Sequence, residues 1–137
     1  MESGDFYGNE QAAAIGAAGQ LRIEHRDAAG KATVLKEGIK VQERELISTT
    51  FMGVAALRAY YAAQMADAYA NDILLSLHLK ATMMKVSDPI LFGHAVSVFY
   101  ASVFARHAAT FARLGVNPNN GLGDLYAKIA TLPEAEC

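Results

Sequence analysis

The short run from Ile73 to Lys80 limits most narrowly what this chain can fold into. It reads ILLSLHLK, is almost wholly apolar, and lies between two longer segments with helical spacing. A short, nearly continuous apolar run is typical of a strand that is buried on both faces of a sheet. Such a strand needs neighbours on either side. The sequence therefore predicts an α/β fold in which part of the sheet comes from outside this chain.

Upstream of this run, residues 20–41 have the pattern of a β-hairpin. Apolar and polar side chains alternate over residues 20–27, which is the period of a half-exposed strand. Residues 28–31 supply a turn that contains a glycine, and residues 33–36 return as the partner strand. After Gly38, residues 39–41 can extend that strand.

A first helix is predicted from about Thr49 to Tyr69, with Ser48 or Thr49 as its N-cap. Many alanines favour it, and the Asn71-Asp72 pair ends it. Apolar residues that recur at helical spacing predict its buried face. These residues are Val54, Leu57, Tyr61, Met65 and Ala68.

A second long helix is predicted to begin at Asp88, which suits an N-cap, followed by Pro89 at the first helical position. Gly115 closes it, and a turn over VNPNNGLG leads to a final helix over residues 122–132. The buried stripe predicted for the second helix is Phe92, Val96, Phe99 and Val103.

The predicted order is hairpin, helix, buried strand, helix, helix. We expect one globular domain over residues 1–137, since no repeat or linker is visible and 53% of the residues are apolar against 19% charged. The two ends read as interrupted: residues 1–9 resemble a loop from the middle of a protein, and the tail after Pro133 begins a helix and stops within one turn. A natural frayed end can look the same.

Charge and composition exclude several classes of partner. The net charge is -2, the pI is near 6.0, and the basic residues are scattered, which argues against a nucleic acid or an anionic membrane. The apolar stretch from Pro89 to Ala105 is too short and too polar for a membrane span. No signal peptide is recognisable at the start, and the single cysteine, Cys137, favours a reducing cytoplasm.

Lys80 is the strongest candidate for chemistry. Side chains alternate along a strand, so Ser76, His78 and Lys80 share one face, and Lys80 lies at the strand's carboxyl end, where open α/β sheets bind ligands. Partial desolvation can lower the pKa of a lysine and suit it to proton transfer, and its ammonium can bind a substrate carboxylate. The commoner role of a lysine at a strand end is simply to reach solvent.

Other candidates are weaker. Lys85 reads as a solvated loop lysine, and His78 is either a ligand or relay or, more often for such a residue, a hydrogen-bonded core histidine. The histidines lack HxH or HExxH spacing, and the carboxylates form no metal-binding cluster in the sequence. There is no P-loop, and the glycines from Gly115 to Gly123 follow a helix and make no GxGxxG. The residues alone indicate an α/β domain with one candidate lysine.

Four stretches carry a resemblance to a known family. They are GDFYG at residues 4–8, HLKATMMKVSDPI at 78–90, NNGLGDLYAKI at 119–129 and LPEA at 132–135. All four are similar to the bacterial monomeric-type isocitrate dehydrogenases and occur in the same order. The resemblance therefore covers essentially the whole chain.

The resemblance implies an oxidoreductase of the tricarboxylic acid cycle. Such enzymes oxidise D-threo-isocitrate to 2-oxoglutarate and CO2, reduce NADP, and use Mg or Mn. They are several times longer than this chain, and the matched stretch corresponds to part of the larger of their two domains. The lysine of the HLKATMM motif, Lys80 here, is one of two residues that the family is thought to use in proton transfer, and it would contact the substrate.

The family's second proton-transfer residue, a tyrosine, lies outside the matched stretch, as do its metal-binding aspartates, substrate-binding arginines and NADP-binding segments. We therefore expect a cytoplasmic fragment that is inactive alone and binds neither NADP nor metal tightly. Apolar surface exposed by truncation would favour a homodimer. Two alternatives stay open: a non-catalytic binding or structural module with the same sub-fold, and a different enzyme in which Lys80 forms an imine with a carbonyl substrate.

Overall fold

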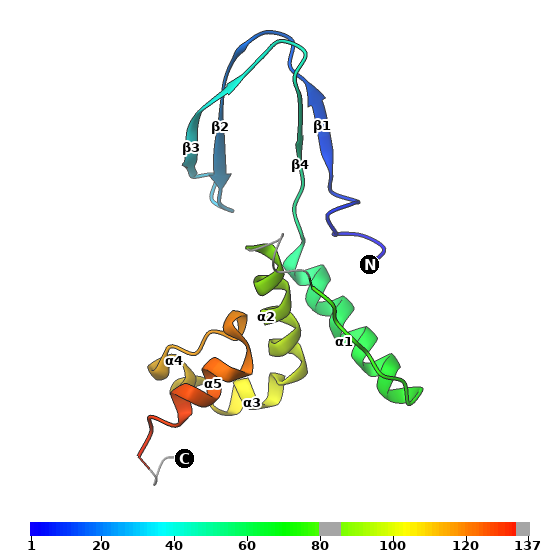
Figure 1. Ribbon diagram of the computed structural model, residues 1–137, viewed down its shortest axis with the longest axis vertical. Helices are drawn as coiled ribbons and strands as arrows, with labels where there is room; N and C mark the ends of the chain where they lie inside the picture. The colour runs from blue at the N-terminus through cyan, green and yellow to red at the C-terminus, as the bar shows by residue number, and fades with distance from the viewer. Residues whose placement is uncertain (80–85, 134–137) are drawn as a thin grey trace. The chain divides into compact units, whose positions relative to one another are not determined.

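The computed structural model describes residues 1–79 and 86–133, and the chain divides into two compact units. Residues 2–52, the β-unit, contain all the strands of the described part. Residues 53–133, the helical unit, contain its helices (Figure 1). Within the described residues, two small antiparallel sheets and five α-helices confirm the predicted mixed α/β class. The assignment of residues 1–137 to a single domain stays a prediction.

The β-unit is one long hairpin with an interruption. Strand β1 pairs with β4 and β2 pairs with β3, both antiparallel, so that one arm of the hairpin runs over residues 11–26 and the other over residues 32–49. Between the two ladders, the backbone N–H groups of Ile15 and Arg44 donate to the carbonyls of Glu45 and Ile15 at 2.9 and 2.7 Å. The strands are β1 (Gln11–Ala14), β2 (Gly19–Arg26), β3 (Ala32–Val41) and β4 (Leu46–Thr49).

The hairpin turn explains why the hairpin over residues 20–41 could be predicted from the sequence. Asp27 Oδ1 accepts hydrogen bonds from the backbone N–H groups of Ala29 and Lys31, each at 2.9 Å. Gly30 adopts φ +82°, a conformation that costs a residue with a Cβ about 1 kcal/mol or more. The turn is therefore encoded locally, and the predicted hairpin over residues 20–41 is confirmed. The sequence did not predict its extension into β1 and β4, because QAAA lacks the β-branched residues that mark a strand.

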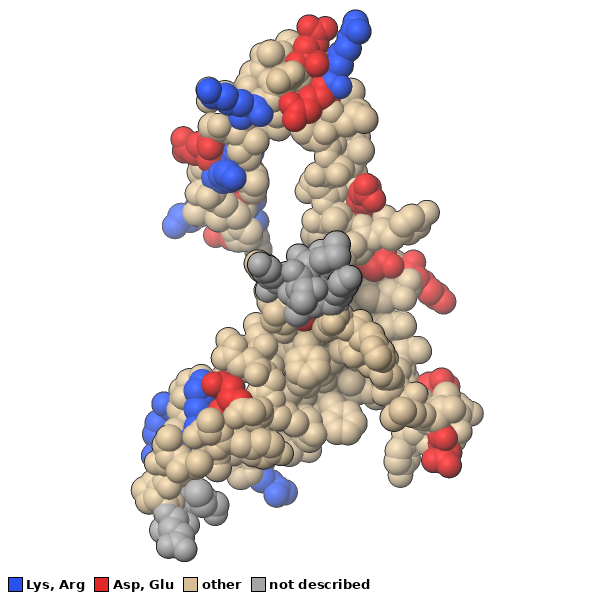
Figure 2. All heavy atoms as spheres, viewed as in Figure 1, with Lys and Arg blue, Asp and Glu red and all other residues tan. Residues whose placement is uncertain are grey.

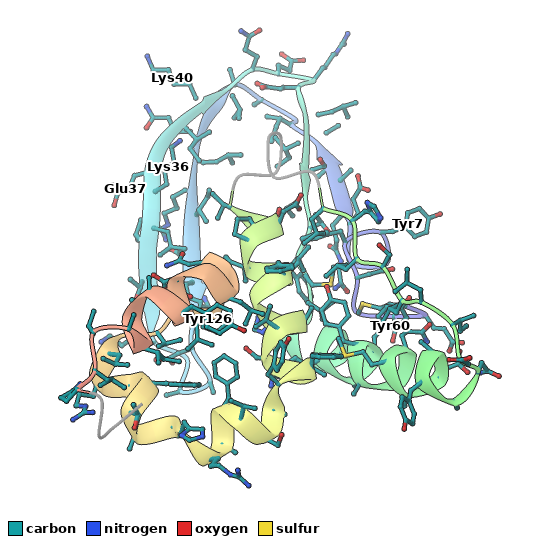
Figure 3. All side chains as sticks on the ribbon, turned by 60° about the horizontal axis from the view of Figure 1, so that its bottom comes forward. Tyr7, Lys36, Glu37, Lys40, Tyr60 and Tyr126 are labelled. Atoms are coloured by element: carbon teal, nitrogen blue, oxygen red, sulfur yellow. The ribbon has the colours of Figure 1, made fainter. Side chains whose placement is uncertain are left out.

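Charged side chains are distributed along the hairpin without gathering by sign. Arg22 and Arg26 both pair with Glu24, which confirms that alternate residues of β2 share a face. Figure 2 shows acidic and basic groups intermixed on the visible face of the β-unit, and Figure 3 shows Lys36 and Lys40 projecting from β3. Val41 is the one buried apolar residue described in this unit. The hairpin therefore rests on backbone hydrogen bonds more than on a core.

Helix α1 (Val54–Ala70) begins later than predicted, with Gly53 as its N-cap. Neither Ser48 nor Thr49 caps it, because both lie in β4. The hydroxyl of Thr50 donates to the carbonyl of Phe6, and Asn9 Nδ2 donates to the carbonyl of Phe51 at 2.9 Å. Pairing with the N-terminal segment thus holds residues 46–51 in extended chain, and the propensity-based start was wrong. The predicted buried face is confirmed in Leu57, Tyr61 and Ala68.

The predicted end of this helix is confirmed. Asn71 is the C-cap, and its side chain donates to the carbonyl of Asp67 at 2.9 Å. Asp72 has φ 54°, and the N–H of Ile73 donates to the carbonyl of Ala68 at 3.0 Å, which is the pattern of a left-handed helix end.

The buried strand predicted at Ile73–Lys80 is not formed over its described residues. Residues 73–79 have no regular secondary structure, and Leu74 is 94% exposed. The strands that the structure describes pair only within the β-unit, so none of them pairs with this segment. An apolar run without neighbouring strands cannot form a sheet interior. Lys80, the last residue of that prediction, lies outside the described residues.

The second predicted helix is divided into three: α2 (Ser87–Phe99), α3 (Ala101–Arg106) and α4 (Ala108–Leu114). It begins one residue before the predicted Asp88, and the chain changes direction after α2 (Figure 1). The breaks lie at Tyr100 and His107, where ψ is 28° and 20°. Their consequence is aromatic packing within the bent segment, with the rings of Phe104 and Phe111 edge to face at 5.3 Å.

Of the predicted stripe on this segment only Val96 is buried, and the prediction was wrong for Phe92, Phe99 and Val103, which are 40, 65 and 40% exposed. Gly115 ends α4 with φ 63°, as predicted. A 3₁₀ turn, η1 (Pro118–Asn120), then leads directly into α5 (Gly121–Ile129). The core of the helical unit is made by Leu57, Tyr61, Ala68, Ala95, Val96, Phe111 and Leu125.

Candidate functional site

Lys80, the predicted catalytic and substrate-binding residue, lies outside the described residues, as does Lys85. The structure describes what flanks them: residues 77–79 before the gap and the first turn of α2 after it. The candidate site is therefore built from these flanks and from the elements against which they lie.

His78 does not occupy a core position. It is exposed, and its Nε2 lies 2.8 Å from Ser76 Oγ. This contact agrees with the prediction that residues 76 and 78 share one side of the chain, although no strand is present. His78 was predicted to be either a ligand or relay or a hydrogen-bonded core histidine, and the core position is wrong because the residue is exposed.

Residues on both sides of the gap line one cavity, which we call the motif cavity. Its volume is about 360 Å³. Leu79, the residue directly before Lys80, contributes to it from one flank and Asp88 from the other. The third wall comes from η1 and the start of α5, some thirty residues further along. The lining residues are Leu77, Leu79, Asp88, Pro89, Phe92, Asn119, Asn120 and Gly121.

Local geometry brings η1 against α2. The backbone N–H of Asn119 donates to Asn117 Oδ1 at 3.0 Å, which caps the turn. Gly121 has φ +76°, and a Cβ built on it would lie 3.7 Å from the ring of Phe92. Gly93 faces Asn119 so closely that a side chain there would collide with it. The wall of the motif cavity formed by η1 thus depends on small residues.

Asp88 is the buried charged residue of this site, at 7% exposure. The sequence predicted that Asp88 is a helix cap, but the N-cap of α2 is Val86 and Asp88 lies inside the first turn. A carboxylate in the first turn of a helix is stabilised by the positive end of the helix dipole. Sequence reasoning gave no role in the site to Asp88, Asn119 or Gly93. The NNG string was the one available signal, and it was interpreted only as a turn.

Comparison with known proteins identifies the family to which this sequence and site belong. The family model described as monomeric isocitrate dehydrogenase matches residues 1–137. The chain belongs to the monomeric isocitrate dehydrogenase family. The resemblance carried by the four motifs is thereby confirmed.

Curated relatives in three bacteria bear similar names. The chain is 52% identical to isocitrate dehydrogenase [NADP] 2 of Colwellia maris and 52% identical to isocitrate dehydrogenase [NADP] of Azotobacter vinelandii. It is 46% identical to isocitrate dehydrogenase [NADP] 2 of Mycobacterium tuberculosis. Each match covers 136 residues, 99% of this chain but only 18% of the relative. The chain thus spans about a fifth of the length of these relatives, as the motifs led us to expect.

The described residues do not form the metal site that this family implies. No group of three or more His, Cys, Asp or Glu side chains among residues 1–79 and 86–133 is placed to hold a metal ion. His94 Nδ1 instead lies 3.5 Å from Arg58 Nη1, linking α2 to α1, and His107 lies against Phe111 with ring centres 5.9 Å apart. In the same part of the chain, no helix is long and apolar enough to cross a membrane.

Two of the tyrosines, Tyr61 and Tyr7, lack the environment of a proton-transfer residue. Burial, with a smaller contribution from Tyr60, raises the pKa of Tyr61 above its ordinary value of 10.0. Tyr61 therefore stays protonated near neutral pH and is a poor base. Tyr7 is 90% exposed and projects outward (Figure 3). Neither residue resembles an acid–base partner held in a cleft.

A second cavity, of about 370 Å³, lies between α3, α4 and α5 and is lined mainly by apolar residues. Phe104, Phe111, Leu125 and Tyr126 are among its lining residues, and Tyr126 is labelled on α5 in Figure 3. His107 and Thr110 are its polar neighbours. It carries no cluster of ionisable groups and is suited to packing against apolar surface.

Proposed function

We propose that this chain is one segment of an NADP-dependent isocitrate dehydrogenase, and that Lys80 is its catalytic residue. The observation that carries the proposal is the family match over residues 1–137, which includes the HLKATMMKVSDPI string around Lys80. The cavity that begins at Leu79 supports it, because a cavity bounded by both flanks of the motif lies beside the chain that leads to the lysine.

Lysine chemistry suits the reaction that the relatives' names specify. Oxidation of the C2 hydroxyl of isocitrate removes its proton as hydride leaves for the nicotinamide. Loss of the β-carboxylate as CO2 then leaves an enolate that must be protonated. The Lys80 amine would hydrogen-bond to the C2 oxygen, accept its proton, and stabilise the negative charge that returns to that oxygen in the enolate.

The rest of the enzyme must supply what this chain lacks. We propose that NADP, and the Mg or Mn on which the family depends, are held by residues outside this chain, because the described residues include no metal cluster. The partner tyrosine would come from outside as well. A single lysine cannot bind a tricarboxylate, a cation and a dinucleotide, so the purified chain is expected to be inactive alone. We place the reaction in the cytoplasm.

Isolated as 137 residues, the chain is proposed to self-associate, and a homodimer is the simplest form. Large apolar residues are exposed on the helical unit, among them Tyr69, Leu74 and Phe99 at 91, 94 and 65%. Burying such side chains against a second copy removes them from water. Sedimentation velocity at rising concentration should show a growing dimer fraction; a monomer throughout would contradict this.

A hybrid enzyme tests the proposed function. The matching segment of the Azotobacter vinelandii relative, 52% identical over 136 residues, is replaced by this chain. The hybrid is expected to form NADPH from isocitrate with Mn²⁺ and NADP, while the purified chain forms none. Lys80→Met in the hybrid is expected to lower kcat by about 10²- to 10⁴-fold, the usual contribution of a positioned acid or base.

Gel filtration and thermal unfolding confirm that each hybrid is folded. A folded hybrid without activity would contradict the proposed function and favour a non-catalytic module. Isocitrate-dependent NADPH formation by the purified chain alone would show that the site needs no other segment.

A further inference from the structure

The cavity of about 370 Å³ between α3, α4 and α5, which we call the apolar cavity, has no part in the proposed chemistry. Apart from His107 and Thr110, its lining residues are aliphatic or aromatic, and none of them is Asp, Glu, Lys or Arg. A carboxylate or phosphate ligand would therefore find no cation there. The lining favours an occupant that is itself apolar.

The bent segment from α2 to α4 builds the wall of the apolar cavity. The helix breaks at Tyr100 and His107 bring the rings of Phe104 and Phe111 edge to face at 5.3 Å, and the ring centre of His107 lies 5.9 Å from that of Phe111. Phe111 and Leu125 are each only 8% exposed. This part of the lining is packed as a protein core is, so the cavity is preformed.

Other lining residues of the same cavity are open to solvent. Val103 is 40% exposed and Tyr126 is 65% exposed. Phe99, which is 65% exposed, packs edge to face on the lining residue Tyr100 at 4.8 Å. The cavity is thus continuous with exposed apolar surface. Its lining lacks contact partners on one side, which forfeits dispersion energy, and surface of this kind marks an interaction site.

The length of the relatives indicates what covers this surface. The match spans residues 1–137 but only 18% of each of the three relatives, so most of an enzyme of that length lies outside this chain. A segment of the same polypeptide meets the cavity at an effective concentration that does not fall on dilution, whereas a second copy of the chain is diluted away.

We propose that the apolar cavity is the docking site for an apolar segment of the parent dehydrogenase outside residues 1–137. That segment places large aliphatic or aromatic side chains between α3, α4 and α5. This inference rests on the proposed function only in that the chain is one segment of a longer enzyme. It does not depend on the role of Lys80.

The first test measures access to Val103, in α3, in the purified chain and in the hybrid enzyme. Val103→Cys is close in size to the original residue and reacts with N-ethylmaleimide, and peptide mass spectrometry reads the label at position 103 alone. Each rate is divided by the rate in urea-unfolded protein. The hybrid is expected to label about tenfold or more slowly than the dilute chain, because the docked segment must open first.

A second test fills the apolar cavity. Val103→Trp is expected to leave the thermal midpoint of the purified chain unchanged or raised, because the indole occupies empty space. In the hybrid it is expected to lower the midpoint by several degrees, because the indole and the docked segment compete for the same volume. Ala105→Trp, at an exposed position of α3 that does not line the cavity, is the matched control and is expected to lower neither.

Each alternative occupant has its own outcome. Equal labelling of Val103→Cys in chain and hybrid would show that the cavity stays open, as a small-molecule site requires, and would overturn the inference. Protection that appears in the chain alone as its concentration rises, and is absent from dilute hybrid, would assign the cavity to a second copy and overturn it too. Equal destabilisation of the hybrid by Val103→Trp and Ala105→Trp would show that the contact is not specific to the cavity.

Failure of this inference is distinguishable from failure of the proposed function, because neither test measures activity. An active hybrid with an open cavity would overturn the docking site alone. A Lys80→Met hybrid with full activity would overturn the catalytic role of Lys80 and leave the docking site standing. If the Val103→Trp hybrid does not fold, the labelling of Val103→Cys decides.

Discussion

The β-unit and the helical unit are each stabilised by a different kind of interaction. Val41 is the buried apolar residue described in residues 2–52, whereas residues 53–133 bury a core that includes Leu57, Tyr61 and Phe111. The hairpin keeps its form through backbone ladders and the Asp27 turn. The helices depend on contacts between residues far apart in the sequence. The comparison indicates that the candidate site belongs to the region where distant packing decides the geometry.

The largest difference between the units should appear when a core side chain is removed. Leu57 is 4% exposed and Ile23, on β2, is 49% exposed. Leu57→Ala is expected to lower the free energy of unfolding of the chain by about 2–5 kcal/mol. Ile23→Ala should cost less than about 1 kcal/mol. Urea unfolding followed by circular dichroism at 222 nm measures both. Equal losses would mean that the two units do not differ as described.

Replacing a glycine that has a positive φ should lower the free energy of unfolding by the same amount in either unit, because backbone strain is local. Gly30 in the hairpin turn has φ +82° and Gly115 at the end of α4 has φ +63°, with open space around each. Replacing either by Ala is expected to destabilise the chain by about 1 kcal/mol. Gly16→Ala, at a position with open space and no such φ, is the control. A cost at Gly115 well above that at Gly30 would indicate a packing role that this comparison omits.

The smallest effect on stability is expected from the pH-dependent contact between Asp124 and Lys128 in α5. The pKa of Asp124 is lowered from its ordinary value of 3.8, chiefly by the hydrogen bond from Lys128, whose Nζ lies 2.9 Å from Asp124 Oδ2. A lowered folded-state pKa adds stability that is present above the ordinary value and is lost as pH falls through the folded one.

Lys128→Met should therefore weaken α5 slightly at pH 7, and the difference from wild type should shrink below about pH 3.8. Amide hydrogen exchange in residues 121–129 reports it, with exchange in β2 as the internal control. A difference that persists at low pH would assign the effect to the lysine's other contact, its hydrogen bond to the carbonyl of Gly115.

Local signals in the sequence were reliable here, and signals that needed a distant partner were not. The Asp27–Lys31 turn, the Asn71-Asp72 helix end and the glycine at position 115 could all be predicted, because each is satisfied within a few residues. The strand predicted at Ile73–Lys80 is absent over its described residues 73–79, because none of the described strands pairs with them. The cap at Thr49 failed because residues 46–51 pair with the N-terminal segment instead.

The same division applies to the candidate site. Lys80 was predicted from its place in a motif, which is a local property of the sequence, and its role stays a proposal. The contact between Gly93 and Asn119 and the cavity that Asp88 lines were not predicted, because they arise only where η1 packs on α2. A glycine in the middle of a helical pattern was the available hint, since it costs helix stability and so indicates close packing.

The central claim is that Lys80 is catalytic, and the most direct test sets it against another lysine of the same chain. Lys31, in the exposed hairpin turn, is the matched control, because it belongs to the unit with no proposed role in the reaction. In folded hybrid enzymes, Lys80→Met is expected to lower kcat by about 10²- to 10⁴-fold and Lys31→Met to leave it within about twofold. Equal kcat values in the two variants would contradict the assignment of Lys80.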